Sequence, residues 1–143
     1  MSTLFLDAFS VDKEACENGR WLEIMKMGDE TIRIKLRRTT SKKFREKKHI
    51  LDKEFEEKLT MATGSVQQEL YEDLLAQCIA DSIIVDWEGI DLGEGPIPYT
   101  YENAYALLKE FPDFMNRVFD TASLRENYTI KDKERAKTIL KKN

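Results

Sequence analysis

The stretch IIVDWEGIDLGEGPIPYTYEN, residues 83–103, organises this 143-residue chain. It begins as the apolar end of a predicted helix and passes through Trp87, and a run of glycines and prolines then delays the next helix until Thr100. Because glycine permits a positive φ and proline fixes φ, we expect residues 84–100 to form one defined loop. The apolar side chains of Trp87 and Tyr99 indicate that this loop folds back onto the flanking helices.

The segment before the first long helix predicts a β-hairpin preceded by an arm. Residues 1–18 show no clear period, so we expect a loosely packed arm or a short strand there. Residues 21–37 alternate apolar and polar side chains on either side of Gly28 and Asp29, which supply turn chemistry. This pattern is typical of an antiparallel hairpin with one face covered by other elements.

The rest of the chain carries helical periods and helix-start signals. Thr39, Thr40 and Ser41 each offer an N-cap for a long charged helix, Thr100 can cap another, and Pro112 suits the first turn of a later one. Ser65 and Gln68 have the spacing of a capping box. We expect helices over residues 42–59, 66–82, 101–123 (two helices, divided at Pro112) and 129–143, the last of them basic and poor in apolar residues.

The predicted fold is α+β and mostly α. An antiparallel β-hairpin at residues 21–37 packs on a bundle of about four to five helices, within one domain that spans residues 1–143. The helical body covers residues 41–124. A chain of this length buries about 68–70% of its unfolded surface without covalent staples. We therefore expect Cys16 and Cys78 to be reduced thiols.

Charge is distributed unevenly along the chain. The net charge is −4, but residues 33–48 hold nine basic side chains against the single acid Glu46, a local balance of +8. Such a segment can bind a polyanion, solvate a helix face or pair with an acidic partner surface. Because the sequence pI is about 5.2 and Phe44 is the only aromatic side chain interleaved with these bases, we do not expect nucleic-acid binding.

Side chains for catalysis or metal binding form no recognisable pattern. The single histidine, His49, lies among lysines, and no phosphate-binding, metalloprotease or nucleophile-elbow motif occurs. We therefore expect no enzymatic activity, no cofactor and no metal site. We also expect a cytoplasmic protein outside the membrane, because neither a signal peptide nor a long apolar span is present. Carboxylates that gather around the loop without calcium-loop spacing are Asp81, Asp86, Glu88, Asp91 and Glu94.

Three stretches carry a family resemblance. They are GRWLEI at 19–24, IIVDWEGI at 83–90, and PIPYTYENAYALLKEFPDFMNRVFDTA at 96–122. In this combination, over residues 15–128, the chain resembles the tail assembly chaperones of long-tailed bacteriophages and their prophages. The resemblance implies a non-virion protein of the bacterial cytoplasm that keeps the tape-measure protein soluble and extended while the tail tube polymerises. It also implies a longer form made by ribosomal frameshifting.

The partners that follow from the resemblance are the tape-measure protein, the tail tube protein through the longer form, and further copies of the chain. Two alternatives stay open: another phage morphogenesis or adaptor protein, and a small nucleic-acid-binding regulator that uses residues 33–48. For an apolar helical client we expect helix-in-groove docking on the surface of residues 66–82 and 101–123. The candidate contact residues are Trp87, Tyr99, Tyr101, Tyr105, Leu108, Phe111, Phe114, Arg37, Arg38, Lys42 and Lys43.

Overall fold

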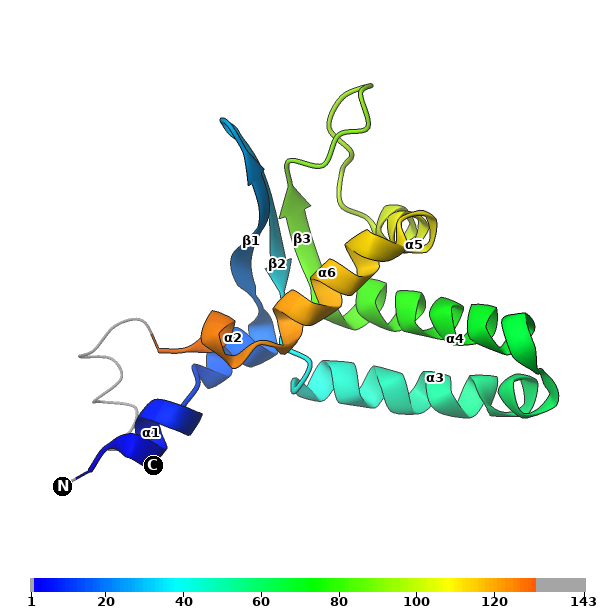
Figure 1. Cartoon of the computed structure of the whole chain (residues 1–143), viewed down its shortest axis with the longest axis horizontal. Coiled ribbons are helices and arrows are strands. Elements are labelled where there is room, and N and C mark those ends of the chain that lie inside the picture. The colour runs from blue at the N-terminus through cyan, green and yellow to red at the C-terminus, as the bar shows by residue number, and fades with distance from the viewer. Residues whose placement is uncertain (1, 131–143) are drawn as a thin grey trace.

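The computed structural model describes residues 2–130 and shows a mostly helical α+β protein, as predicted (Figure 1). A three-stranded sheet stands beside the last two long helices, and a pair of antiparallel helices extends away from its base. The elements in chain order are α1 (Leu4–Phe9), α2 (Lys13–Asn18), β1 (Arg20–Met27), β2 (Glu30–Leu36), α3 (Lys42–Met61), α4 (Gly64–Cys78), a π-helical turn (Ile79–Ile83), β3 (Ile84–Glu88), α5 (Tyr101–Glu110), α6 (Pro112–Ser123) and a 3-10 turn (Arg125–Tyr128).

The predicted hairpin is present, but it is part of a larger sheet. Strand β2 pairs antiparallel with β1 on one side and with β3 on the other. Sequence periodicity assigned β3 to the end of a helix and the start of a loop, and that assignment is wrong. The segment is rich in β-branched and aromatic side chains, which pack well on a pleated surface. Pairing of Ile84 with Leu36 and of Trp87 with Ile34 therefore overrides the local helical pattern.

The first eighteen residues form two short helices, so the alternative of a short strand is wrong. Helix α2 is anchored, because the carboxylate of Asp12 caps it at the amide of Ala15 (3.2 Å) and Cys16 is buried. Helix α1 buries no residue and matches the expected loose arm. It lies at the opposite end of the molecule from the tip of the sheet (Figure 1).

Helices α3 and α4 form an antiparallel pair. The hydroxyl of Ser41 accepts a hydrogen bond from the amide of Phe44 (3.3 Å), so Ser41 is the cap of α3 among the three predicted candidates. The predicted capping box before α4 is wrong, because the helix begins at Gly64 and its cap makes no side-chain hydrogen bond. The Gln68 amide instead donates to Glu72 within the same helix (3.1 Å), a local alternative that the spacing rule does not consider.

The hydrophobic core lies where the end of α4 meets the sheet and the pair α5–α6. Thr100 caps α5 through the amide of Asn103, and Pro112 opens α6, as predicted. The largest side chains with almost no exposure are Tyr128, Ile34, Leu36, Leu51, Leu74, Ile79, Ile83, Ile84, Leu108 and Val118.

The described chain ends in a buried aromatic anchor. Tyr128 is fully buried, and its hydroxyl donates to the carbonyl of Leu36 in the central strand (3.0 Å). This contact fastens the end of the described chain to the sheet. The predicted basic helix over 129–143 falls outside the described residues except for Thr129 and Ile130, neither of which is helical.

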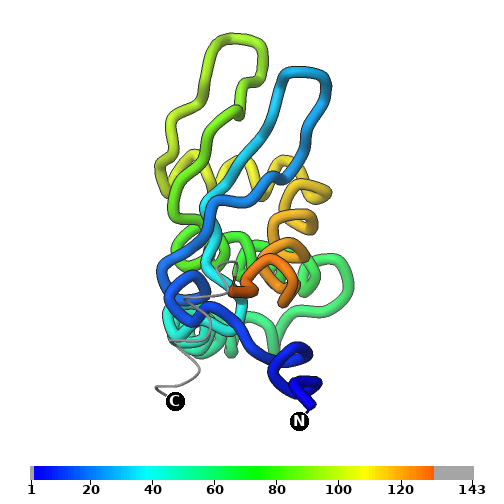
Figure 2. The backbone as a smooth tube through the Cα atoms, turned by 90° about the vertical axis from the view of Figure 1, so that its left-hand side faces the viewer, coloured from blue at the N-terminus to red at the C-terminus, as the bar shows by residue number. Residues whose placement is uncertain are grey.

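The segment after β3 folds back onto the sheet, as predicted, although the loop begins at Gly89 and not at residue 84. The amide of Ile97 donates to the carbonyl of Ile90 (2.8 Å), and Asp91 and Pro96 form an isolated bridge. Figure 2 shows the result: the β1–β2 hairpin and the returning loop rise side by side.

Replacing Gly89 by alanine should destabilise the fold by about 3 kcal/mol or more. Gly89 has φ +87°, and a Cβ placed there would lie 2.2 Å from the carbonyl oxygen of Thr31. Gly93 is the matched control: it has φ +103° but open space around it, so Gly93→Ala should cost only the backbone strain, about 1–2 kcal/mol. Urea unfolding followed by circular dichroism measures both, and equal losses would contradict the predicted close approach.

Candidate protein-binding groove

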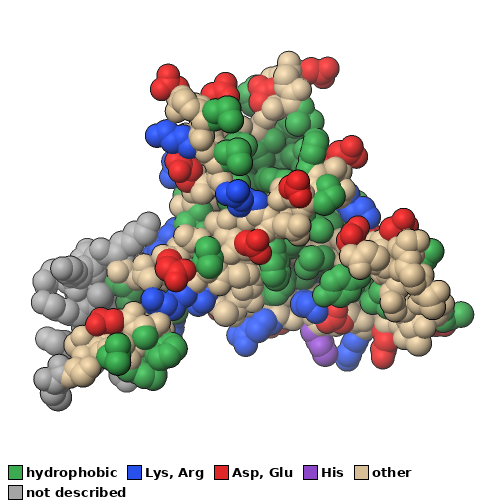
Figure 3. Space-filling view, viewed as in Figure 1, with side chains coloured by type: hydrophobic (Ala, Val, Ile, Leu, Met, Phe, Trp, Pro, Cys, Tyr) green, Lys and Arg blue, Asp and Glu red, His purple; other side chains and the backbone are tan. Residues whose placement is uncertain are grey.

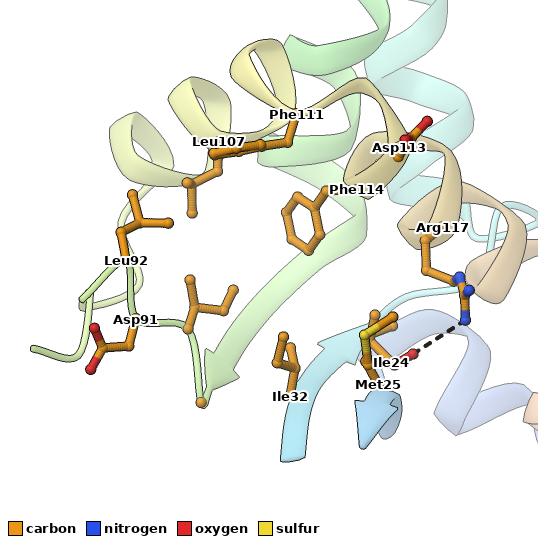
Figure 4. Close-up of a pocket in the computed structure, with 12 residues that line it drawn as sticks. Ile24, Met25, Ile32, Asp91, Leu92, Leu107, Phe111, Asp113, Phe114 and Arg117 are labelled. Atoms are coloured by element: carbon orange, nitrogen blue, oxygen red, sulfur yellow. Dashed lines mark hydrogen bonds between the residues drawn. The ribbon is translucent and has the colours of Figure 1, made fainter. Parts of the chain in front are cut away.

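An apolar groove of about 420 Å³ opens between the tip of the sheet, the returning loop and the α5–α6 junction (Figure 4). Each wall comes from a different part of the chain, so the groove exists only in the folded protein. Its principal apolar lining residues are Ile24, Met25, Ile32, Leu92, Phe111 and Phe114.

A β-bulge in β1 decides which side chains face the groove. Glu23 pairs with Arg33, but Met25 pairs with Ile32, so Ile24 is an extra residue on its strand. Strict alternation would place Met25 on the same face as Glu23. The bulge instead turns Met25 to the face of Ile32, and both line the groove.

The bulge also provides a polar contact at the base of the groove. The guanidinium of Arg117 on α6 donates a hydrogen bond to the carbonyl of Ile24 (3.4 Å; Figure 4). This contact ties α6 to the bulged strand. Arg117 is the one cationic side chain in the groove lining, and the whole lining lies within the described residues.

Several large apolar side chains of the groove lining are partly exposed to solvent. Met25 is 47% exposed, Phe111 43% and Leu92 62%. A second hollow of about 680 Å³ continues past the Met25–Ile32 pair towards Met27 and Pro96. Figure 3 shows apolar side chains gathered between the two rising segments, with acidic side chains at their tips. Concave apolar surface of this kind is characteristic of binding sites.

The structure separates the predicted aromatic and apolar contact residues into two groups, of which only one lines the groove. Phe111 and Phe114 lie in the groove wall. Trp87 and Leu108 are buried in the core, so their side chains shape the site without offering contact surface. Sequence reasoning missed the hairpin and loop contributions, and the only available signal was a methionine-rich strand end beside the predicted turn.

The three tyrosines lie outside the groove lining. Tyr99 packs edge-on against Trp87, with ring centroids 5.4 Å apart, and it is partly buried. Tyr101 and Tyr105 stack on each other along α5, with ring centroids 6.2 Å apart. The hydroxyl of Tyr105 donates to the carboxylate of Asp73 on α4. Tyr105 therefore joins α5 to α4, and Tyr99 joins the loop to β3.

The basic candidates have mixed roles. The guanidinium of Arg37 donates to the backbone carbonyls of Glu17 (3.0 Å) and Ser82 (3.3 Å), so it is a structural tie. The Nε of Arg38 is buried and finds no hydrogen-bond partner among residues 2–130. Lys42 and Lys43 are exposed at the start of α3. Other bases of the segment pair with carboxylates of the same chain: Arg33 with Glu88, Lys47 with Asp81 and Lys48 with Asp52.

Cys16 and Cys78 are free and buried, and burial raises the pKa of both thiols. Over residues 2–130, no group of three or more histidine, cysteine or acidic side chains is arranged to hold a metal ion. Within the same range no helix is both long and apolar enough to cross a bilayer.

The hydrogen bond between Tyr105 and Asp73 should be visible in a pH titration. This bond, together with burial, raises the pKa of Tyr105 from 10.0 to about 12. The bond therefore stabilises the folded protein fully below about pH 10 and is lost as the pH rises through about 12. Burial also raises the pKa of Tyr128, so absorbance at the tyrosinate band should show more than one late-ionising tyrosine, and Tyr105→Phe should remove one of these late steps. Loss of an early-ionising tyrosine in that variant would contradict the contact.

Comparison with known proteins places the chain in a prophage family. A family model described as YdaY prophage protein matches residues 39–141, which is more than half of the chain. The match includes the returning loop, α5 and α6, and it begins after the β1–β2 hairpin. No curated protein and no solved structure matches the chain. The family match covers enough of the sequence to decide the assignment: this chain belongs to the YdaY prophage protein family.

Proposed function

We propose that this prophage protein is a tail assembly chaperone that binds the tape-measure protein and keeps it soluble and extended while the tail tube polymerises. Membership of a prophage family supports a role in phage biology, and the motifs of the loop and of α5–α6 resemble those of tail assembly chaperones. The observation that carries the proposal is the open apolar groove beside the sheet.

The dimensions of the groove suit one face of an amphipathic helix. A volume of about 420 Å³ accommodates a few large side chains, as an i, i+3, i+4 stripe would present. Burying each one contributes roughly 1.5–3 kcal/mol, which association entropy largely offsets. A single copy therefore binds weakly. Many copies along one long client gain avidity without any site being tight, which allows release as the tube grows.

The chemistry of the lining favours binding over catalysis. The polar side chains of the groove are Asp91, Asp113 and Arg117, and its described lining contains no hydroxyl, thiol or imidazole that could act as a nucleophile. We propose that the protein acts without covalent chemistry, in the cytoplasm of the bacterial host.

The test is co-expression with the tape-measure protein of the same prophage. Wild-type protein should keep the client in the soluble fraction. The double variant Met25→Ser/Phe111→Ser should reduce the soluble client at least about tenfold, because two apolar contacts are lost. Both residues are partly exposed, so the melting temperature of the variant should stay close to that of the wild type.

A matched control removes exposed apolar surface elsewhere. Met61 and Tyr71 lie on the α3–α4 pair and outside the groove lining, and Met61→Ser/Tyr71→Ser should leave the client yield unchanged. Equal amounts of soluble client with the groove variant and with the wild type would contradict the proposal. So would a wild-type protein that leaves the client insoluble.

A further inference from the structure

Carboxylates stand on opposite rims of the groove. Asp91 comes from the returning loop and Asp113 from the first turn of α6, and Figure 4 shows them on opposite sides of the apolar lining. Glu30 lines the continuation of the groove at the hairpin end. Arg117 is the one base in this lining, and its hydrogen bond to the carbonyl of Ile24 leaves its positive charge in place. Carboxylates therefore lie on both sides, and the groove with its continuation has three of them against one guanidinium.

The two rim carboxylates, Asp91 and Asp113, also have local structural roles. One carboxylate oxygen of Asp91 accepts hydrogen bonds from the amides of Gly93 (2.6 Å) and Gly95 (3.2 Å), which shapes the turn. Asp113 lies at the start of α6, where the helix dipole favours a negative charge. The groove and its continuation therefore carry a net negative charge, which favours a cationic partner.

We propose that the groove selects an amphipathic helix whose apolar stripe is flanked on both sides by lysines or arginines. This inference rests on the proposed function for the idea that a helix occupies the groove. A helix that lies with its apolar stripe on Met25, Ile32 and Phe114 directs the positions beside that stripe at the two rims. Because both rims carry carboxylates, cations are favoured at both flanks and acidic flanks are repelled.

The apolar floor and the acidic rims then have separate roles. Contact with the floor supplies most of the affinity, since apolar burial is independent of the sign of flanking charges. The rims distinguish basic from acidic helices of equal hydrophobicity, and they speed the encounter with a basic one. The partner of stated chemistry is thus a basic amphipathic segment, such as one repeated along a long client.

Two synthetic helical peptides test the charge preference directly. Both carry the same leucine stripe, one with lysines and the other with glutamates at every flanking position, and each has a fluorescent label. At low salt, anisotropy titrations should show about tenfold or tighter binding of the lysine peptide. The ratio should shrink towards one at about 1 M salt, where the screening length is about 3 Å.

The variant Asp91→Asn/Asp113→Asn locates the preference. Asparagine keeps an oxygen that can accept the turn hydrogen bonds of Asp91, so the loop should be retained, and thermal melting checks this. The ratio of the two affinities should fall about threefold to tenfold. The control Asp120→Asn/Glu57→Gln removes the same charge outside the groove lining and should leave the ratio unchanged.

The outcomes separate this inference from the proposed function. Equal affinity for the two peptides, or an equal fall in the control variant, overturns the charge selection even if the tape-measure protein still depends on Met25 and Phe111. If neither peptide binds and the client is also indifferent to those two residues, the groove is not the binding site and both proposals fail. A lysine preference that Asp91→Asn/Asp113→Asn abolishes supports the inference.

Discussion

The indole of Trp87 connects the sheet to the loop that builds the groove. Its ring is buried, and its Nε1 donates to the carbonyl of Ile97 on the returning side of the loop (2.8 Å). Tyr99 packs edge-on against the indole, and its hydroxyl donates to the carbonyl of Ile84 in β3 (3.0 Å). An indole donor left unpaired in this position would cost about 1–3 kcal/mol. The two rings thus hold the loop over the sheet, and Ile90 can pack beside the core.

The groove depends on this arrangement because each of its walls comes from a different part of the chain. The loop supplies Leu92, the bulged hairpin supplies Met25, and the α5–α6 junction supplies Phe111. The α3–α4 pair extends away from this site, and α1 lies at the other end of the molecule (Figure 1). Binding in the groove therefore engages one end of the protein. The exposed apolar surface of α1 and the basic start of α3 remain outside it.

Features that depend on a few neighbouring residues were predictable. The hairpin around Gly28, the caps at Ser41 and Thr100, and the helix start at Pro112 all appear where their local patterns indicate. Each involves backbone geometry or a hydrogen bond within about four residues, so its signal is complete in the local sequence. The aromatic candidates were only partly informative. Phe111 and Phe114 line the groove, but the local sequence around them does not show which residues face them across it.

The amino-acid sequence by itself determined a mostly helical α+β chain, the hairpin, the positions of most helix boundaries, and a loop that must turn back because of its glycines, prolines and apolar side chains. The tertiary structure alone decided that β3 is a strand, that a bulge turns Met25 into the groove, and that Asp91 and Asp113 stand on opposite rims. The physical reason is that these features depend on contacts between residues far apart in the sequence. Pairing of Ile34 with Trp87 brings together residues far apart in the chain, and the gain from that contact leaves no periodic mark on either segment.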